Sequence, residues 1–167
     1  MGLFNIFKSE KRSEEENVTP KTIKSLSDIL TIDFKNSPDD SYTKGESEEN
    51  ESGDLLTNYR KNLNPKELGL FDSLEIKVFE NKGNKNFVFK GYDFRKSDIS
   101  KVKQLVDNLF LIYGEDGSDL GKFKTEDDSN LRSEYWTGRM WTDEKHETPL
   151  MVSYDSEVGL SLTIWTK

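Results

Sequence analysis

The sequence predicts an α+β fold, a two-layer antiparallel sheet with one main amphipathic helix packed on one face, and three observations support it. Several short segments alternate apolar with polar side chains, which is typical of half-buried strands. One longer segment, 98–113, instead repeats its apolar residues at steps of three and four, the spacing of a helix face. Short polar turns between strand segments favour antiparallel pairing. The expected element order is β-β-α-β-β-β.

The first half of this order is a hairpin followed by the helix. Residues 73–80 alternate apolar and charged side chains, and 86–92 form a second strand after the polar turn 81–85. The apolar stripe of 98–113 predicts a helix with one packed face, and Gly114 is placed to end it in a left-handed conformation.

The second half contains three strand segments after a polar loop at 115–130. Residues 134–142 are rich in aromatic side chains and threonine, which pleated surfaces favour. Residues 150–154 form the next strand. Residues 159–166 alternate most regularly, and the turn 155–158 before them is short enough for a hairpin.

The apolar residues predict a boundary between an N-terminal extension, 1–57, and a globular domain, 58–167. Residues 36–54 contain one apolar side chain, Tyr42, among Ser, Glu, Asp, Asn and Gly. Such a segment buries too little apolar surface to offset its ordering entropy, so we expect a disordered acidic linker there.

The rest of the extension is predicted to be partly helical. Thr19-Pro20 is typical of a helix start, and the apolar spacing that follows predicts a helix within 20–34. Residues 56–63 indicate a further short helix that ends at Asn64-Pro65. The start, 1–12, is apolar and then basic, a pattern that fits weak contact with an anionic membrane surface or a frayed terminus.

Composition narrows the function classes. The 167 residues include no Cys and one His, which argues against disulfides, a thiolate nucleophile and metal sites built from Cys or paired His. The net charge of −8 argues against a general nucleic-acid binder, because phosphate contacts need a basic surface. No apolar run reaches the length of a membrane-spanning helix. The lack of Ala, with abundant Lys and Asn, suggests an AT-rich bacterial genome, and cytoplasmic residence is expected.

Motifs for catalysis or cofactor binding are weak, and we expect no cofactor. The sequence has no phosphate-binding glycine loop and no nucleophile elbow. His146 lies in a charged segment before a proline, which is typical of a surface histidine. The acidic loop 115–128 offers carboxylates such as Asp116 and Asp119, but not at the spacing of a helix–loop–helix calcium site. A carboxylate-based or divalent-metal hydrolase therefore stays an alternative.

The most informative segment for binding is 135–141, YWTGRMW. In a regular strand Trp136, Gly138 and Met140 share one face, which we assign to the core. The opposite, outer face then carries a set of aromatic and guanidinium side chains, to which the last strand adds one tryptophan: Tyr135, Arg139, Trp141 and Trp165. Tyr, Trp and Arg dominate binding hot spots.

Three roles stay open for this outer face: cover by the N-terminal residues 23–34, a recognition surface, or a small-molecule pocket. We expect a non-enzymatic domain that binds a protein partner through an acidic and aromatic surface, which suits a basic partner. A toxin-neutralising immunity-type protein is the narrower version, because an acidic surface speeds association with a basic partner. The alternatives are a membrane-surface adaptor that uses 1–12 and the hydrolase above.

Overall fold

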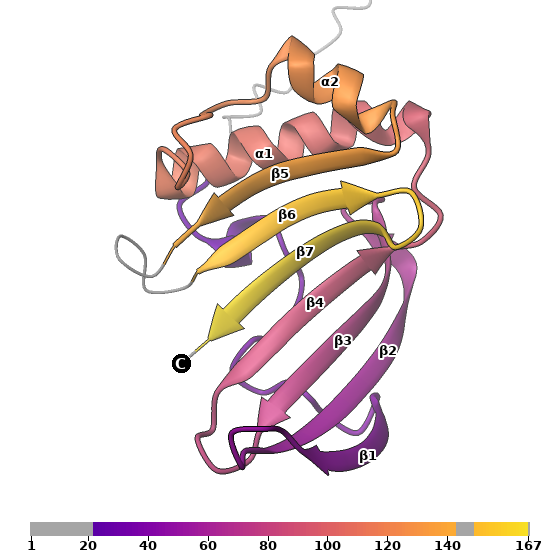
Figure 1. Cartoon of the computed structure of the whole chain (residues 1–167), viewed down its shortest axis with the longest axis vertical. Coiled ribbons are helices and arrows are strands. Elements are labelled where there is room, and N and C mark those ends of the chain that lie inside the picture. Colours follow the sequence, from indigo (N-terminus) through magenta and orange to yellow (C-terminus); the bar gives the residue numbers. More distant parts are fainter. Residues whose placement is uncertain (1–21, 143–148, 167) are drawn as a thin grey trace, which may run out of the picture.

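A computed structural model describes residues 22–142 and 149–166, and within them seven strands form one antiparallel sheet (Figure 1). The strands are β1 (Thr43–Glu49), β2 (Leu55–Glu67), β3 (Phe71–Phe79), β4 (Lys85–Gly91), β5 (Tyr135–Trp141), β6 (Leu150–Asp155) and β7 (Gly159–Thr166). Their order across the sheet is β1-β2-β3-β4-β7-β6-β5. The sheet therefore consists of two meanders, β1–β4 and β5–β7, joined where β4 pairs with β7.

The main helix, α1 (Ile99–Tyr113), confirms the helical periodicity of 98–113. A 3₁₀ turn, η2 (Lys96–Asp98), leads into it, and Gly114 ends it with a φ of 76° and an N–H that donates to the Phe110 carbonyl. Figure 1 shows α1 on one side of the sheet, behind β5 in this view. The predicted α+β fold with a helix on one sheet face is confirmed. None of the helices in the described residues is long and apolar enough to cross a membrane.

The core lies between the sheet and α1, and cross-strand rows of apolar side chains build its sheet side. One row runs across five paired strands through Ile76, Phe87, Ile164, Leu150 and Trp141. All five side chains are fully buried. The buried stripe of α1 completes this core: Ile99, Val102, Leu105, Val106 and Leu109.

The N-terminal residues 22–42 cover the same sheet face as α1, and not the outer face. Leu26 and Leu30 are buried in the core, and the Phe34 ring meets the core-facing Phe87 edge-on at 5.0 Å between centroids. The expected helix within 20–34 is reduced to a single 3₁₀ turn, η1 (Leu26–Asp28). The backbone leaves the helical path because the Thr31 N–H and hydroxyl both bind the Glu67 carboxylate on β2.

Residues 36–54 correct the expectation of a disordered linker, because 43–49 form edge strand β1. All seven side chains of β1 are exposed, so the strand contains none of the apolar residues by which a buried strand is recognised in a sequence. Its order comes from backbone pairing with β2 and from a 2.8 Å hydrogen bond between the hydroxyls of Ser47 and Thr57. An edge strand that buries no side chain is invisible to an argument from apolar content.

The expected short helix at 56–63 is also wrong, since these residues belong to the long strand β2. Tyr59 pairs with Ile76 and Leu56 with Phe79, so the neighbouring strand β3 overrides the local helical spacing. The boundary drawn between residues 57 and 58 lies inside this strand. The apolar and basic segment 1–12 lies outside the described residues.

Candidate binding surface

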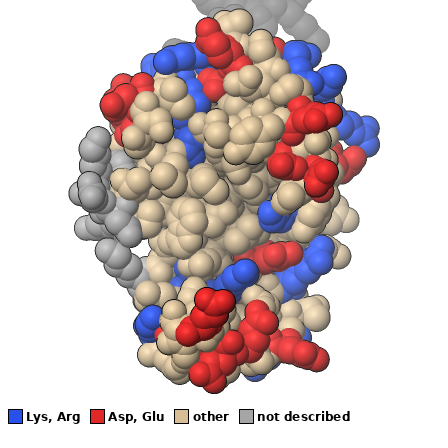
Figure 2. Space-filling view, in the orientation of Figure 1, with Lys and Arg blue, Asp and Glu red and all other residues tan. Residues whose placement is uncertain are grey.

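One face of the sheet is covered by α1 and residues 22–42, whereas none of the described residues packs over the other, which we call the open face. Its central row crosses four paired strands through Val88, Thr163, Met151 and Met140. Figure 2 views this face and shows a broad uncharged area over β6 and β7, with charged side chains gathered around it. In a chain that is 34% charged, an uncharged area of this extent is the most distinctive surface feature in the view.

The four predicted site residues do not come together on the open face. Tyr135 is exposed and Trp165 is partly exposed, and both lie on this face. They occupy opposite ends of the sheet, since Tyr135 begins β5 and Trp165 lies near the end of β7, which runs parallel to β5. Arg139 and Trp141, by contrast, are 3% and 0% exposed, so their predicted outward position is wrong.

A β-bulge at Gly138 explains this correction. Gly138 has a φ of +75°, and the pairing of β5 with β6 shifts register between Trp136 and Arg139. An extra residue at a bulge reverses the alternation of side chains beyond it. Trp136 and Trp141 consequently both point into the core, while Met140, which was assigned to the core, is 46% exposed.

Arg139 is the centre of a buried ion cluster. Its guanidinium donates to both Asp127 oxygens, at 2.9 and 2.6 Å, and to the Gly121 carbonyl at 3.1 Å. The Asp116 carboxylate lies 3.7 Å from Arg139 Nε and accepts hydrogen bonds from the N–H groups of Ser118 and Gly121. These contacts fasten the loop 115–124 and the short helix α2 (Thr125–Leu131) to β5. The cluster holds the fold together at this edge of the sheet.

The charge state of Asp127 reflects these contacts. Burial raises the pKa of Asp127, but hydrogen bonds from Arg139, the Trp136 indole and the Lys124 N–H outweigh it and leave the pKa below its ordinary value. Asp127 is therefore ionised at neutral pH and fully paired with Arg139. Its sequence position, in a run of three acids, suggested only a solvated loop.

The alternative of a metal or carboxylate site finds little geometric support in the described residues. Asp116 is buried and bound to Arg139 and backbone N–H groups, whereas Asp119 is exposed in the same loop. Within 22–142 and 149–166, no group of three or more His, Asp or Glu side chains is placed to hold a metal ion. His146 lies outside the described residues.

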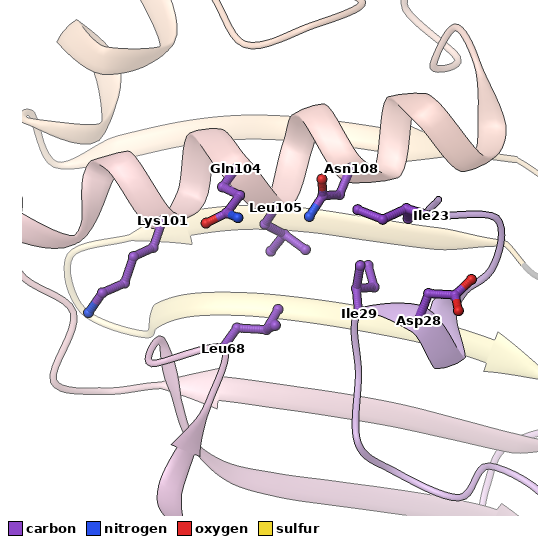
Figure 3. A pocket seen from close by; sticks show the side chains of 8 residues that line it. All are labelled: Ile23, Asp28, Ile29, Leu68, Lys101, Gln104, Leu105 and Asn108. Atoms are coloured by element: carbon purple, nitrogen blue, oxygen red, sulfur yellow. The ribbon is translucent and has the colours of Figure 1, made fainter. Parts of the chain in front are cut away.

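Two cavities of similar size lie on opposite faces of the molecule. The first, about 260 Å³, lies between η1 and α1 on the covered side, and its apolar lining is Ile23, Ile29, Leu68 and Leu105 (Figure 3). The Lys101 ammonium group at its rim is already bound to the Asp98 carboxylate and the Gly69 carbonyl. The second, also about 260 Å³, lies on the open face and includes Trp165 in its lining. Sequence reasoning had selected Trp165, but not the cavity.

The fold and this surface define an α+β protein with one covered and one open sheet face. Comparison with models of known protein families, with curated proteins and with solved structures gave no match.

Proposed function

We propose that this chain is a non-enzymatic, cytoplasmic protein-binding domain whose recognition surface is the open face. The observation that carries the proposal is the uncharged central row of that face in a chain of very high charge. Val88, Met151 and Met140 offer apolar contact, and Thr163 between them adds a hydroxyl. Interface centres are depleted of charge and enriched in Met and aromatic residues, with polar residues at the rim.

The charged surroundings support a basic partner. The exposed edge strand β1 carries Glu46, Glu48 and Glu49, and the whole chain has a net charge of −8. A net negative charge accelerates encounter with a basic protein without adding to the apolar contact at the centre. The narrower version of the proposal is an immunity-type protein that neutralises a basic toxin by covering its surface.

The test is capture of the partner from the source organism by the full-length chain, with a charge placed at the centre of the open face. Thr163→Arg keeps the strand but puts a cation between Val88 and Met151. We expect this variant to lose at least about tenfold in partner affinity, as expected for a charge buried without a counter-ion at an interface centre.

The matched control is Leu111→Arg, because Leu111 is 62% exposed on α1, away from the open face. It adds the same charge and should leave capture unchanged. Circular dichroism establishes that both variants are folded. Equal capture by Thr163→Arg and the parent chain contradicts the proposal, as does the absence of any stoichiometric protein partner.

A further inference from the structure

The open face ends in a recess of about 260 Å³, which we call the Trp165 recess. Its lining comes from β3, β4 and β7 and the segments beside them: Phe79, Lys82, Asn84, Asn86, Pro149, Trp165 and Thr166. Asn86 and Trp165 are direct cross-strand partners, so their side chains stand next to each other on this face. The recess thus continues the proposed recognition surface.

Phe79, Pro149 and Trp165 give the recess an apolar part, and among its polar side chains the Thr166 hydroxyl already donates to the Lys85 carbonyl. The indole N–H of Trp136 donates to Asp127, and that of Trp141 donates to the Gly114 carbonyl. Within the described part of the chain, the indole N–H of Trp165 has no acceptor. The side-chain amides of Asn84 and Asn86 likewise have no hydrogen-bond partner among the described residues.

Among the described residues, the lining of the recess presents almost no free charge. Lys82 is the one charged residue among them, and its ammonium group lies 2.8 Å from the Asp54 carboxylate. An anionic ligand would have to compete with Asp54, and a cation would meet no free carboxylate in the described lining. The chemistry therefore favours a neutral ligand with an apolar body and amide-type hydrogen-bonding groups.

We infer that the Trp165 recess receives an uncharged aromatic or aliphatic side chain of the protein partner. Trp165, Phe79 and Pro149 contact that side chain. The amides of Asn84 and Asn86 and the indole N–H bind the partner's backbone N–H and C=O groups on either side. The volume suits one side chain, and a pocket that takes an anchor residue is where binding energy concentrates in an interface. This inference rests on the proposed function and names the partner's anchor.

The test uses a small probe in place of the unidentified partner. N-acetyl-phenylalanine methylamide carries one aromatic side chain between two backbone amides. Titrated into the ¹⁵N-labelled full chain at millimolar concentrations, it should shift the indole resonance of Trp165 in a saturable way. The indole resonances of Trp136 and Trp141 should stay in place, because both rings are fully buried.

A matched pair of variants assigns the binding to the recess. Asn86→Leu keeps the size of the side chain but removes its amide, and should weaken the probe about fivefold, the effect of one lost hydrogen bond. Asn58→Leu makes the same change on β2, on the same face but outside the recess, and should have no effect. Unshifted Trp165, or equal probe binding by Asn86→Leu and the parent, overturns the inference. Two control compounds can also overturn it. One is N-acetyl-glycine methylamide, which has the two amides but no side chain, if it shifts the Trp165 resonance as much as the probe does. The other is methyl glucoside, a neutral ligand without amides, if it shifts that resonance more than the probe does.

The failure of this inference is distinguishable from failure of the proposed function. If Thr163→Arg abolishes partner capture while the probe leaves Trp165 unshifted, the open face binds its partner without this anchor and only the inference is wrong. If the probe binds with the expected selectivity but no protein is captured, the recess stands as a site for a neutral amide and the proposed function is wrong.

Discussion

Asp127 and Arg139 form the ion pair on which the β5 edge of the molecule depends. Both side chains are more than nine-tenths buried, and the guanidinium makes two hydrogen bonds to the carboxylate. A buried ion pair contributes little net stability compared with apolar packing, but loss of one partner leaves the other charge buried without a counter-ion. The pair is therefore more sensitive to mutation than its net energy suggests.

Asp127→Asn should destabilise the protein by about 3 kcal/mol at neutral pH, because it leaves the buried Arg139 with the more distant Asp116 as its remaining counter-ion among the described residues. The effect should depend on pH. The pKa of Asp127 is lowered in the folded state, so its stabilisation is complete above its ordinary pKa near 3.8 and is lost as the pH falls through the lowered value. Urea unfolding of parent and variant from neutral pH downward measures this difference.

The two unfolding curves should converge in acid, once the pH has fallen below the lowered pKa of Asp127. Asp128→Asn is the matched control, since Asp128 is the next residue and pairs with Arg132 on the surface. It should change stability little at any pH. A constant difference between parent and Asp127→Asn over the whole pH range would show that the carboxylate's charge is irrelevant.

The sequence singled out Arg139 as a functional candidate but did not predict that its side chain is buried. The same side chain was expected on the outer face, because alternation along 135–141 was counted without a bulge. A glycine within an aromatic strand is compatible with either a regular strand or a bulge. The choice depends on the register with β6, which local sequence does not contain. Trp165 was placed correctly because β7 pairs regularly with both neighbours.

At the scale of elements, the bulge in β5 controls which side chains the strand buries. A Cβ on Gly138 would lie 1.7 Å from the Val152 carbonyl oxygen, and its φ of +75° disfavours any other residue. Gly138→Ala should therefore destabilise the protein by roughly 3 kcal/mol or more, since both the backbone strain and the clash must be relieved. Urea unfolding of the variant measures this loss.

Gly83→Ala provides the matched control. Gly83 has nearly the same φ, +72°, but a Cβ there would meet no atom within 4 Å. It should carry only the strain of the left-handed conformation, about 1–2 kcal/mol. Equal losses in the two variants would mean that the close approach of β5 to β6 does not matter.

The elements that sequence predicted well are those whose pattern is local and whose burial is one-sided. Helix α1 and strand β7 each show their apolar period within their own residues. Strand β1 has no buried side chain, and the spacing in β2 also fits a helix. Strand β2 forms because β3 offers it a partner, and β1 forms because β2 does, which is a tertiary effect that local propensity cannot report.

At the scale of the whole molecule, we expect the sheet and its N-terminal cover to unfold as one cooperative unit. The fragment 58–167 lacks β1, the first residues of β2, and the buried Leu26 and Leu30. Large apolar side chains removed from a core cost about 2–5 kcal/mol each, which approaches the total stability of a small domain. We expect 58–167 to lose its cooperative thermal transition and its dispersed amide spectrum.

The fragment 22–167 keeps these residues and should retain both signals. Circular dichroism and ¹H–¹⁵N spectra of the two fragments, compared with the full chain, test the expectation. A stable, well-dispersed 58–167 would restore the boundary that the apolar content indicated. The fold class could be predicted from the composition and from the spacing of apolar residues. The boundary of the folding unit depends on contacts between residues far apart in the sequence, which that spacing does not report.

The single pairing of β4 with β7 has a consequence for the newly made chain. The meander β1–β4 leaves the ribosome first, and the strand that pairs with its free edge, β7, is translated after the other six described strands. Until then β4 presents a bare backbone edge beside Phe87 and Phe89, which are fully buried in the finished protein. Such edges invite strands from other chains. Exchange of the C-terminal meander between two nascent copies is therefore the misassembly to which this topology is most vulnerable.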